Sequence, residues 1–500
     1  MTIVLNDRAD FTLEHAYRVW RNSEDVRFSS TAIGKMLTGK EAFAAFVNSD
    51  RAQFIYGTTS APGARAKERL SDDAQTAQVG SLRTFVSVRA AFGGKLLAQS
   101  TKRLIVFARL VNFIEGTGRV RPDLAQQIAD LIAHPLPAVP LRGSAGPGEV
   151  IPLRSLFDDI ADVPLELGEP MTLINGSPCA TAFVTECVFT AAHQLALALR
   201  VFCLSMEAFG APFEHIDNAL TRLWDDPYDQ LAITRMRTLL HDATQEDRRR
   251  YQAPVSWRII PRVFGVAYRT ADLLQDVATH ALTSISDNPV FVFGDLTDDA
   301  NHTFSTGGFY NGQAARAIDM LNAVYADLCV LCAKQTSKLL DGDMTELPPL
   351  LVEPGSRLVG TEFLAWMQND FAERVRLAAT PSLLSLGLDD PQGVQSDVAS
   401  PVFSAYERHL TAAECLNHAL AILSWVCSEA LRLADRQPAS ELMPLREKIQ
   451  SVIPHVGSVN VQDYDQRLTQ IAQWFAEVGN GDHEDLVGPI TFQNNTIGIN

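Results

Sequence analysis

The sequence predicts a mainly α-helical protein built around a bundle of long helices. Apolar residues recur every three to four positions over several long stretches, which is the spacing of one helix face. Runs with the alternation typical of strands are few and short. Hydrophobic residues make up 46% of the 500 residues and charged residues 20%, so the chain has enough apolar side chains for one large packed core.

The helical stretches can be placed in order along the chain. They cover residues 180–208, 262–284, 313–340, 361–379 and 404–434. The third has about 28 residues and would be about 42 Å long, a length typical of helices that lie side by side. PVFVF (289–293) and AVPL (138–141) are short strand candidates that we expect at loop edges. We expect an N-terminal domain over 1–205, a central long-helix bundle over 206–450, and a C-terminal helical segment and tail over 451–500.

Charge and cysteine usage exclude several classes of protein. A net charge of −17 repels phosphate backbones, so we expect no nucleic-acid partner. Polar residues interrupt the first ten positions before a signal-peptide core could form, and no 18-residue apolar run occurs, so we expect no membrane partner. Seven cysteines scattered through apolar helical stretches fit reduced thiols and a cytoplasmic location.

Three short motifs resemble ligand sites but lack the residues that such sites need. GKMLTGKE (34–41) has the glycine and lysine spacing of a phosphate-binding loop, but Glu41 stands where a Ser or Thr is needed. Cys329 and Cys332 form an isolated pair inside a predicted helix, which indicates core packing. Glu414 and His418 lie four residues apart without an evident third ligand. We therefore expect no metal and no cofactor.

The candidate chemistry lies in polar, turn-rich segments between the helices. Asn175 and Gly176 precede a long predicted helix, where we expect free backbone N–H groups to face a ligand. The segments are Tyr56-Gly57, GSAGPGEVIPL (143–153), LINGS (173–177), QAPVSWRIIPRVFG (252–265), SDNP (286–289) and GGFYNG (307–312).

In this order the segments resemble the histidine and phenylalanine ammonia-lyase family. Its members carry a Y-G motif, GSxGASGDLAPL, LINGT, QDxYSxRxxPQVxG, SDNP and GGNFHG, so the resemblance covers most of the chain. It implies a mainly α protein with the long central helical bundle of the ammonia-lyase and fumarase type. It also implies a homotetramer in which more than one subunit builds each active site.

The loop over 143–153 departs from the family pattern at its centre. In the family, Ala-Ser-Gly cyclises and loses water to form a methylidene-imidazolone, an electrophile that turns the substrate amine into a leaving group. Here Pro147 stands where Ala-Ser should be, before Gly148 and Glu149. The Ser144-Ala145-Gly146 order does not help, because ring closure needs a glycine directly after the serine. We expect a member of the family that lacks the ring.

The resemblance implies roles for five residues, each with a simpler alternative. Tyr56 matches the catalytic base, or is a buried core tyrosine. Arg258 matches the residue that binds the substrate carboxylate, or forms a structural ion pair. Asn175 and Gln252 match substrate-binding amides, or cap helices. Tyr310 matches an aromatic residue of the pocket wall, or packs in the ordinary way.

Other positions differ from the family and bear on the substrate. Phe85 replaces a histidine and Val255 a tyrosine of the family's site. Glu362 falls where family members carry a residue that contacts the substrate side chain, and a carboxylate there suits a cationic group. A glutamate on a helix surface is the alternative. Asp397 is the only carboxylate left in the segment that matches the family's Gln-Glu-Asp.

Together these features predict a carbon–nitrogen lyase that works without the methylidene-imidazolone. The same features also fit an enzyme that runs the reverse reaction, in which it adds an amine to its substrate or cyclises it. The substrate would be a small amino-acid-like molecule with a cationic group. Ergothionase, a more distant member of the same superfamily, eliminates trimethylamine without the ring. The alternative is an inactive homologue that serves as a binding or structural subunit, which the changes at Phe85 and Val255 favour.

Overall fold

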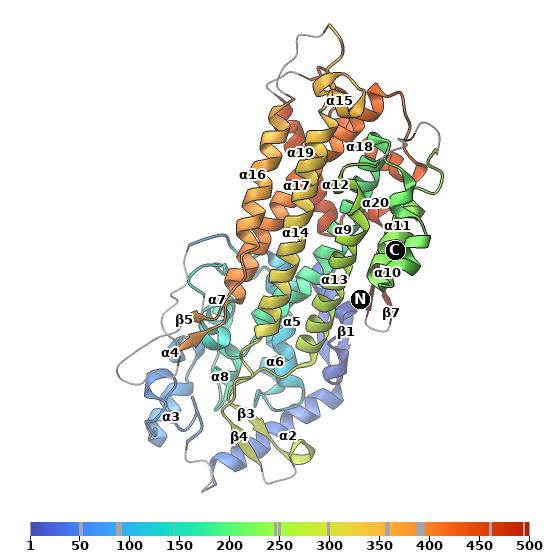
Figure 1. Ribbon diagram of the computed structural model, residues 1–500. Helices are drawn as coiled ribbons and strands as arrows, with labels where there is room; N and C mark the ends of the chain where they lie inside the picture. The colour runs from blue at the N-terminus through green and yellow to red at the C-terminus, as the bar shows by residue number, and fades with distance from the viewer. Residues whose placement is uncertain are drawn as a thin grey trace.

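The computed structural model describes residues 2–49, 54–86, 93–144, 146–244, 248, 252–297, 301–355, 361–386, 396–459, 463–493 and 496–499. The chain forms an elongated bundle of long helices, with shorter helices and small two-stranded sheets around its lower end and sides (Figure 1).

The long helices are those that the apolar periodicity predicts. They are α9 (Pro178–Phe209), α13 (Ile260–Thr283), α14 (Gly312–Leu339), α16 (Phe363–Ala378) and α17 (Val402–Leu433). Their bounds differ from the predicted ones by one or two residues at each end. Helix α14 packs against α9, α13, α16 and α17, so it lies at the centre of the bundle.

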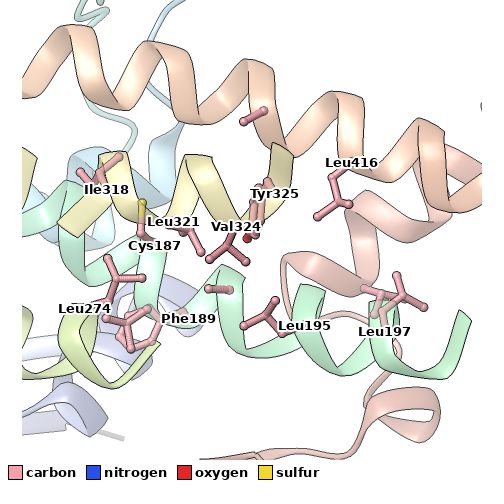
Figure 2. Close-up of a cluster of buried hydrophobic side chains, with 14 of the residues drawn as sticks. Cys187, Phe189, Leu195, Leu197, Leu274, Ile318, Leu321, Val324, Tyr325 and Leu416 are labelled. Carbon is pink, nitrogen blue, oxygen red and sulfur yellow. The ribbon is translucent and has the colours of Figure 1, made fainter. Parts of the chain in front are cut away.

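Apolar side chains from these helices form one continuous core. Figure 2 shows Ile318, Leu321 and Tyr325 of α14 facing Phe189 and Leu195 of α9, and all of them are buried. Each large apolar side chain that leaves water contributes roughly 1.5–3 kcal/mol. Two helical stretches, 169–209 and 402–433, are long and apolar enough to cross a membrane. Their apolar composition is explained by this core, to which they contribute side chains. The folded chain buries 89% and 72% of their most apolar windows.

Shorter elements surround the bundle. The N-terminal part contains α1 (Leu13–Asn22), α2 (Ser30–Val47), α3 (Asp72–Val79), α4 (Leu82–Phe85), α5 (Gln99–Ile114), α6 (Pro122–Asp130), α7 (Val150–Leu156) and α8 (Glu169–Ile174). The remaining helices are α10 (Ala219–Trp224), α11 (Pro227–Leu239), α12 (Val255–Arg258), α15 (Gly342–Thr345), α18 (Met443–Val452), α19 (Tyr464–Gly479) and α20 (Glu484–Val487).

The strands form four separate two-stranded sheets in the described part of the chain. Strand β1 (Thr2–Leu5) pairs in parallel with β2 (Asp25–Phe28). The antiparallel pairs are β3 (Val290–Val292) with β4 (His302–Phe304), β5 (Ser385–Leu386) with β6 (Val398–Ala399), and β7 (Ile490–Gln493) with β8 (Thr496–Ile499). The candidate strand at 289–293 is therefore confirmed as β3, whereas 138–141 contributes only a single bridge, between Pro140 and Leu96.

The short motifs have structural explanations. GKMLTGKE lies inside α2, where no phosphate-binding loop can form. Cys329 and Cys332 are buried in α14, and all seven cysteines are free and buried. The predicted boundary after residue 205 lies inside α9, and the boundary after 450 lies inside α18. The division into three segments stays a prediction.

Candidate functional site

A cavity of about 640 Å³ lies where the polar segments meet. Residues of the loop over 56–63, α4, the loop over 144–149, α7, α8 and the segments at 288 and 305–309 line it. Helices α4, α7 and α8 lie in the lower part of the bundle in Figure 1. The polar side chains around the cavity are those of Tyr56, Ser144, Asn175, Asn288, Ser305, Thr306 and Ser396.

A compact turn places Tyr56 at the cavity. The carbonyl of Ile55 accepts hydrogen bonds from the backbone N–H groups of Thr58, Thr59 and Ser60 at 2.9, 3.0 and 3.1 Å. The N–H of Gly63 donates to Tyr56 Oη at 2.9 Å and holds the ring in position. Gly57 has φ of +66°, and a Cβ there would lie 2.3 Å from Met171 Cγ, so this turn requires glycine.

Asn175 is the C-cap residue of α8 and lines the same cavity as Tyr56. Its carbonyl accepts a hydrogen bond from Arg109, a fully buried guanidinium on α5. The Nε and Nη2 atoms of Arg109 have no hydrogen-bond partner among the described residues. Burial lowers the pKa of Arg109, and the charges of Asp287, Glu149 and Cys179 oppose that shift. A buried cation therefore lies directly behind the cavity wall.

The loop at 147–149 is tightly packed against Asn175 and α9. Gly148 has φ of +69°, and a Cβ there would lie 2.2 Å from Asn175 Oδ1. The Glu149 carboxylate accepts hydrogen bonds from the backbone N–H groups of Cys179 at 2.6 Å and Ala180 at 2.9 Å. Burial raises the pKa of Glu149 to about 7, although these two donors and the charge of Arg109 oppose the rise. Glu149 thus caps the N-terminus of α9 from inside the protein.

The expectation of free N–H groups around Asn175 and Gly176 is wrong. The N–H of Gly176 donates to Asn175 Oδ1 at 2.8 Å, and that of Ser177 donates to Ser286 Oγ at 3.0 Å. Together with the bonds to Glu149, these contacts occupy the donors at the start of α9. Sequence reasoning missed this, because the partners come from segments far along the chain.

The SDNP segment (286–289) forms hydrogen bonds to several of the elements that line the cavity. Asp287 is buried and accepts hydrogen bonds from Thr172 Oγ1 at 2.8 Å and Arg119 Nη2 at 3.3 Å. Asn288 Oδ1 accepts from the N–H of Thr306 at 2.8 Å. These bonds link α8 to the segment before α14, and they explain why the polar segments lie together.

Of the predicted site residues, five line this cavity within one chain. They are Tyr56, Phe85, Asn175, Pro147 and Gly148. Glu149 lies behind the same wall, buried against α9. Further lining residues were not singled out: Asn288 and Phe309 lie inside the quoted segments, and Met171, Ser305 and Thr306 lie just before them.

Gln252, Val255 and Arg258 lie elsewhere, on or beside α12. The carbonyl of Ser256 accepts a hydrogen bond from Gln335 Nε2 at 2.8 Å, near the C-terminal end of α14. Phe309, which lines the cavity, lies just before the opposite end of α14 at Gly312, 23 residues before Gln335 or about 35 Å along the helix. In Figure 1, α12 lies near the upper end of the bundle and α4, α7 and α8 lie in its lower part. Tyr56 and Arg258 of one chain therefore cannot contact the same small molecule.

Glu362, Asp397 and Tyr310 also lie outside this cavity. Glu362 immediately precedes α16. The hydroxyl of its neighbour Thr361 donates to the carbonyl of Leu350 at 2.8 Å. This places Glu362 near α15, at the upper end of the bundle in Figure 1. Asp397 is exposed just before β6. Tyr310 lines a separate cavity of about 460 Å³, whereas its neighbour Phe309 lines the first. The roles of these residues stay predictions.

The long-helix bundle, with a cavity at one end built from the Tyr56 turn and the glycine-containing loop at 146–148, defines a protein of the ammonia-lyase fold. A profile of the family "Aromatic amino acid lyase" matches residues 11–160 and 158–453. The chain belongs to the aromatic amino acid lyase family.

Individual relatives agree with this assignment. Tyrosine 2,3-aminomutase of Myxococcus fulvus is 25% identical over 419 residues, which cover 73% of this chain and 78% of the relative. Histidine ammonia-lyase of Aliivibrio fischeri (strain MJ11) is 26% identical over 376 residues, which cover 69% of this chain and 72% of the relative.

Solved structures share the fold at lower identity. Ergothionase from Treponema denticola, described as an ergothioneine-degrading enzyme and solved with desmethyl-ergothioneine sulfonic acid, superposes with a TM-score of 0.85. It is 16% identical, and the match covers 96% of this chain and 100% of that one. Histidine ammonia-lyase from Trypanosoma cruzi superposes with a TM-score of 0.79 at 18% identity, covering 96% of this chain and 94% of that one.

Proposed function

We propose that this protein is a carbon–nitrogen lyase that works without the methylidene-imidazolone ring. It acts on a small amino-acid-like substrate with a cationic group, either by α,β-elimination or, in the reverse direction, by amine addition or ring closure. Family membership supports the lyase kind. The observation that carries the proposal is a cavity that keeps Tyr56 and Asn175 while its loop has Pro147-Gly148 in place of Ala-Ser-Gly.

The residues of this loop do not fit the ring. Ring formation needs a serine followed directly by a glycine, and residues 146–149 read Gly-Pro-Gly-Glu. The position of Gly148 has no room for a side chain, because a Cβ there would lie 2.2 Å from Asn175 Oδ1. Elimination must therefore use a substrate whose nitrogen already leaves readily, as a quaternary ammonium group does.

Tyr56 is the proposed general base. Tyr56 acts as the phenolate: its oxygen takes the proton from the carbon next to the substrate α-carbon and becomes a hydroxyl, and the electrons of that C–H bond form the C=C double bond. The C–N bond breaks at the same time, and its electrons leave with the nitrogen, which a positive charge on that nitrogen favours. General-base catalysis of this kind contributes about 10²–10⁴-fold to the rate.

Neighbouring copies of the chain complete the site in this proposal. Arg258 would bind the substrate carboxylate, Gln252 would orient it, and Glu362 would contact the cationic end, each from another subunit of a homotetramer. Exposed apolar side chains on the long helices support self-association: Trp366 is 65% exposed and Leu377 74%. The Nε atom of Arg258 is buried without a partner among the described residues, as a group that awaits an anion would be.

The seven buried, unpaired cysteines support a reducing, cytoplasmic location as part of this proposal. The expected partner is the small-molecule substrate.

The test is turnover by the purified protein. Cationic amino acids, including N-trimethylated ones, are incubated with enzyme, and the unsaturated acid is followed by ultraviolet absorbance. Tyr56→Phe should lower kcat by about 10²-fold or more. Tyr228→Phe is the matched control, because Tyr228 lies on α11 and bonds to Asp272. Full activity in Tyr56→Phe would refute the assigned base.

Intact mass tests the ring separately. We expect the mass of the unmodified chain, whereas a mass lower by two waters would show that the ring forms.

The second candidate function is a non-catalytic binding or structural subunit. Phe85, which lines the cavity in place of a histidine, favours it, as do the occupied donors of α9. If this second function is correct, the protein turns over none of the cationic amino acids tested. It still binds a substrate-like carboxylate saturably, and Arg258→Ala abolishes that binding.

A further inference from the structure

A second cleft lies along the bundle, lined by none of the residues that line the cavity at Tyr56. It consists of two adjoining hollows of about 480 and 370 Å³ that share Glu186, Tyr406, Leu410 and Asn480. Helices α9, α17 and α19 line the larger hollow, and α1, α5 and the segment before α5 line the smaller one. Hollows of this size hold small organic molecules.

Glu186 is a buried carboxyl group held rigidly at the junction of the two hollows. Trp20 Nε1 and Thr101 Oγ1 each donate to Glu186 Oε1 at 3.1 Å, and Tyr406 Oη donates to Oε2 at 2.5 Å. Burial raises the pKa of Glu186, and these three donors oppose the rise. A carboxylate accepts about four hydrogen bonds, so one acceptor position remains for a ligand.

Arg103 is a cation of the smaller hollow that forms no ion pair with any described residue. Its one hydrogen bond in the described part of the chain is a long one, 3.4 Å from Nε to the carbonyl of Gln99. Burial lowers the pKa of Arg103, and no carboxylate opposes that shift. The other two cations there are already paired, Arg21 with Asp482 and Lys95 with Glu414 at 3.0 Å. A ligand carboxylate would give Arg103 the ion-pair partner that the described residues do not supply.

The larger hollow includes an apolar wall, to which Leu410, Ala413, Ala472 and Ala476 contribute. Leu410 and Ala413 line it beside His409, whose Nδ1 lies 3.0 Å from Asn322 Oδ1. Burial lowers the pKa of His409 to about 4, so its ring is neutral at neutral pH. Glu414 and His418, the pair noted in the sequence, also line this hollow. No cluster of three or more acidic, histidine or cysteine side chains among the described residues could hold a metal there.

We propose that the second cleft binds a free amino acid with an apolar side chain, at a site separate from the cavity at Tyr56. The α-carboxylate pairs with Arg103, the α-ammonium group donates to Glu186, and the side chain enters the larger hollow between α9 and α17. The guanidinium of Arg103 and the carboxyl group of Glu186 line the same hollow of about 370 Å³, where they can pair with the carboxylate and the ammonium group of one free amino acid.

The test is binding of L-leucine to the full-length protein, measured by calorimetry. Arg103→Gln should weaken binding about tenfold or more, because it removes a charge-assisted hydrogen bond, and Arg103→Lys should restore part of the affinity. Glu186→Gln should also weaken binding. Arg258→Ala should leave L-leucine binding unchanged, which distinguishes this cleft from the substrate cavity, where Arg258 is the proposed carboxylate-binding residue. Thermal unfolding verifies that each variant folds, and Arg103 is suited to substitution because it is only partly buried.

Two matched probes test the zwitterion itself. Leucinamide lacks the carboxylate and 4-methylpentanoate lacks the ammonium group, so each should bind about tenfold more weakly than L-leucine. The proposal is overturned if L-leucine does not bind at millimolar concentration, if both probes bind as tightly as L-leucine, or if the Arg103 variants bind as tightly as the wild type.

Discussion

Glu149→Gln tests how the buried carboxyl at the start of α9 contributes to stability. Glutamine keeps the size of the side chain but does not titrate. In the wild type, burial raises the pKa of Glu149 from 4.5 to about 7, so the folded protein holds this proton more tightly than the unfolded chain does. Between pH 4.5 and 7 the folded state binds more protons than the unfolded state does. Raising the pH over this window therefore lowers the free energy of unfolding.

The magnitude follows from the pKa. At about 1.4 kcal/mol per pKa unit, the rise from 4.5 to about 7 corresponds to about 3 kcal/mol of unfolding free energy. A cooperative unit of 500 residues has an unfolding entropy of about 1 kcal/mol/K, so this energy corresponds to about 3 °C in Tm. The wild type should therefore lose about 2 °C relative to Glu149→Gln between pH 5 and pH 8, because part of the shift acts below pH 5, where the unfolded carboxyl is still partly protonated.

The assay is thermal unfolding of both proteins at matched ionic strength at these two pH values. The difference between the variants isolates Glu149 from the other titrating groups. Glu373→Gln, at a side chain that is 66% exposed, controls for the loss of one negative charge. A Tm difference between wild type and Glu149→Gln that is equal at pH 5 and pH 8 would contradict the burial argument. So would a greater loss of stability in the variant at pH 8, which would mean that Arg109 and the α9 donors outweigh burial.

Two further substitutions test the packing. Gly148→Ala should destabilise the protein by about 1–3 kcal/mol and reduce ligand binding, because its Cβ would lie 2.2 Å from Asn175 Oδ1 at a positive φ. Gly146→Ala is its control, since no atom lies within 4 Å of that Cβ, and equal losses in denaturant unfolding would disprove the steric explanation. Tyr325→Phe removes the donor to Gln194 Oε1 in the core and should cost about 1–3 kcal/mol in urea unfolding, whereas an unchanged midpoint would mean that this bond contributes nothing.

The long helices could be predicted from the sequence because helical periodicity is a local property. Residues three and four positions apart share a face whatever packs against it, so the apolar pattern marked α14 almost to its ends. The cavity was also partly predictable. The order of the polar segments indicated the family, and Tyr56 and Asn175, which lie 119 positions apart, do line one cavity.

The immediate environment of those residues was not predictable, because it depends on contacts between distant parts of the chain. Glu149 caps the helix that begins at Pro178, and Arg109 of α5 lies buried behind Asn175. Neither contact has a local sequence signal. The helical spacing near residue 310 could not decide whether Phe309 or Tyr310 faces the cavity, since the turn before α14 sets that direction.

The sequence by itself determined the helical bundle, the family and the absence of an Ala-Ser-Gly sequence from the loop over 143–153, because all three are properties of residue order. Tertiary structure alone decided that the first N–H groups of α9 bond to Glu149 and that α12 contacts α14 at Gln335, about 35 Å along that helix from its first residue, Gly312. The physical reason is that packing, not spacing along the chain, determines which surfaces meet and which polar groups remain available to a ligand.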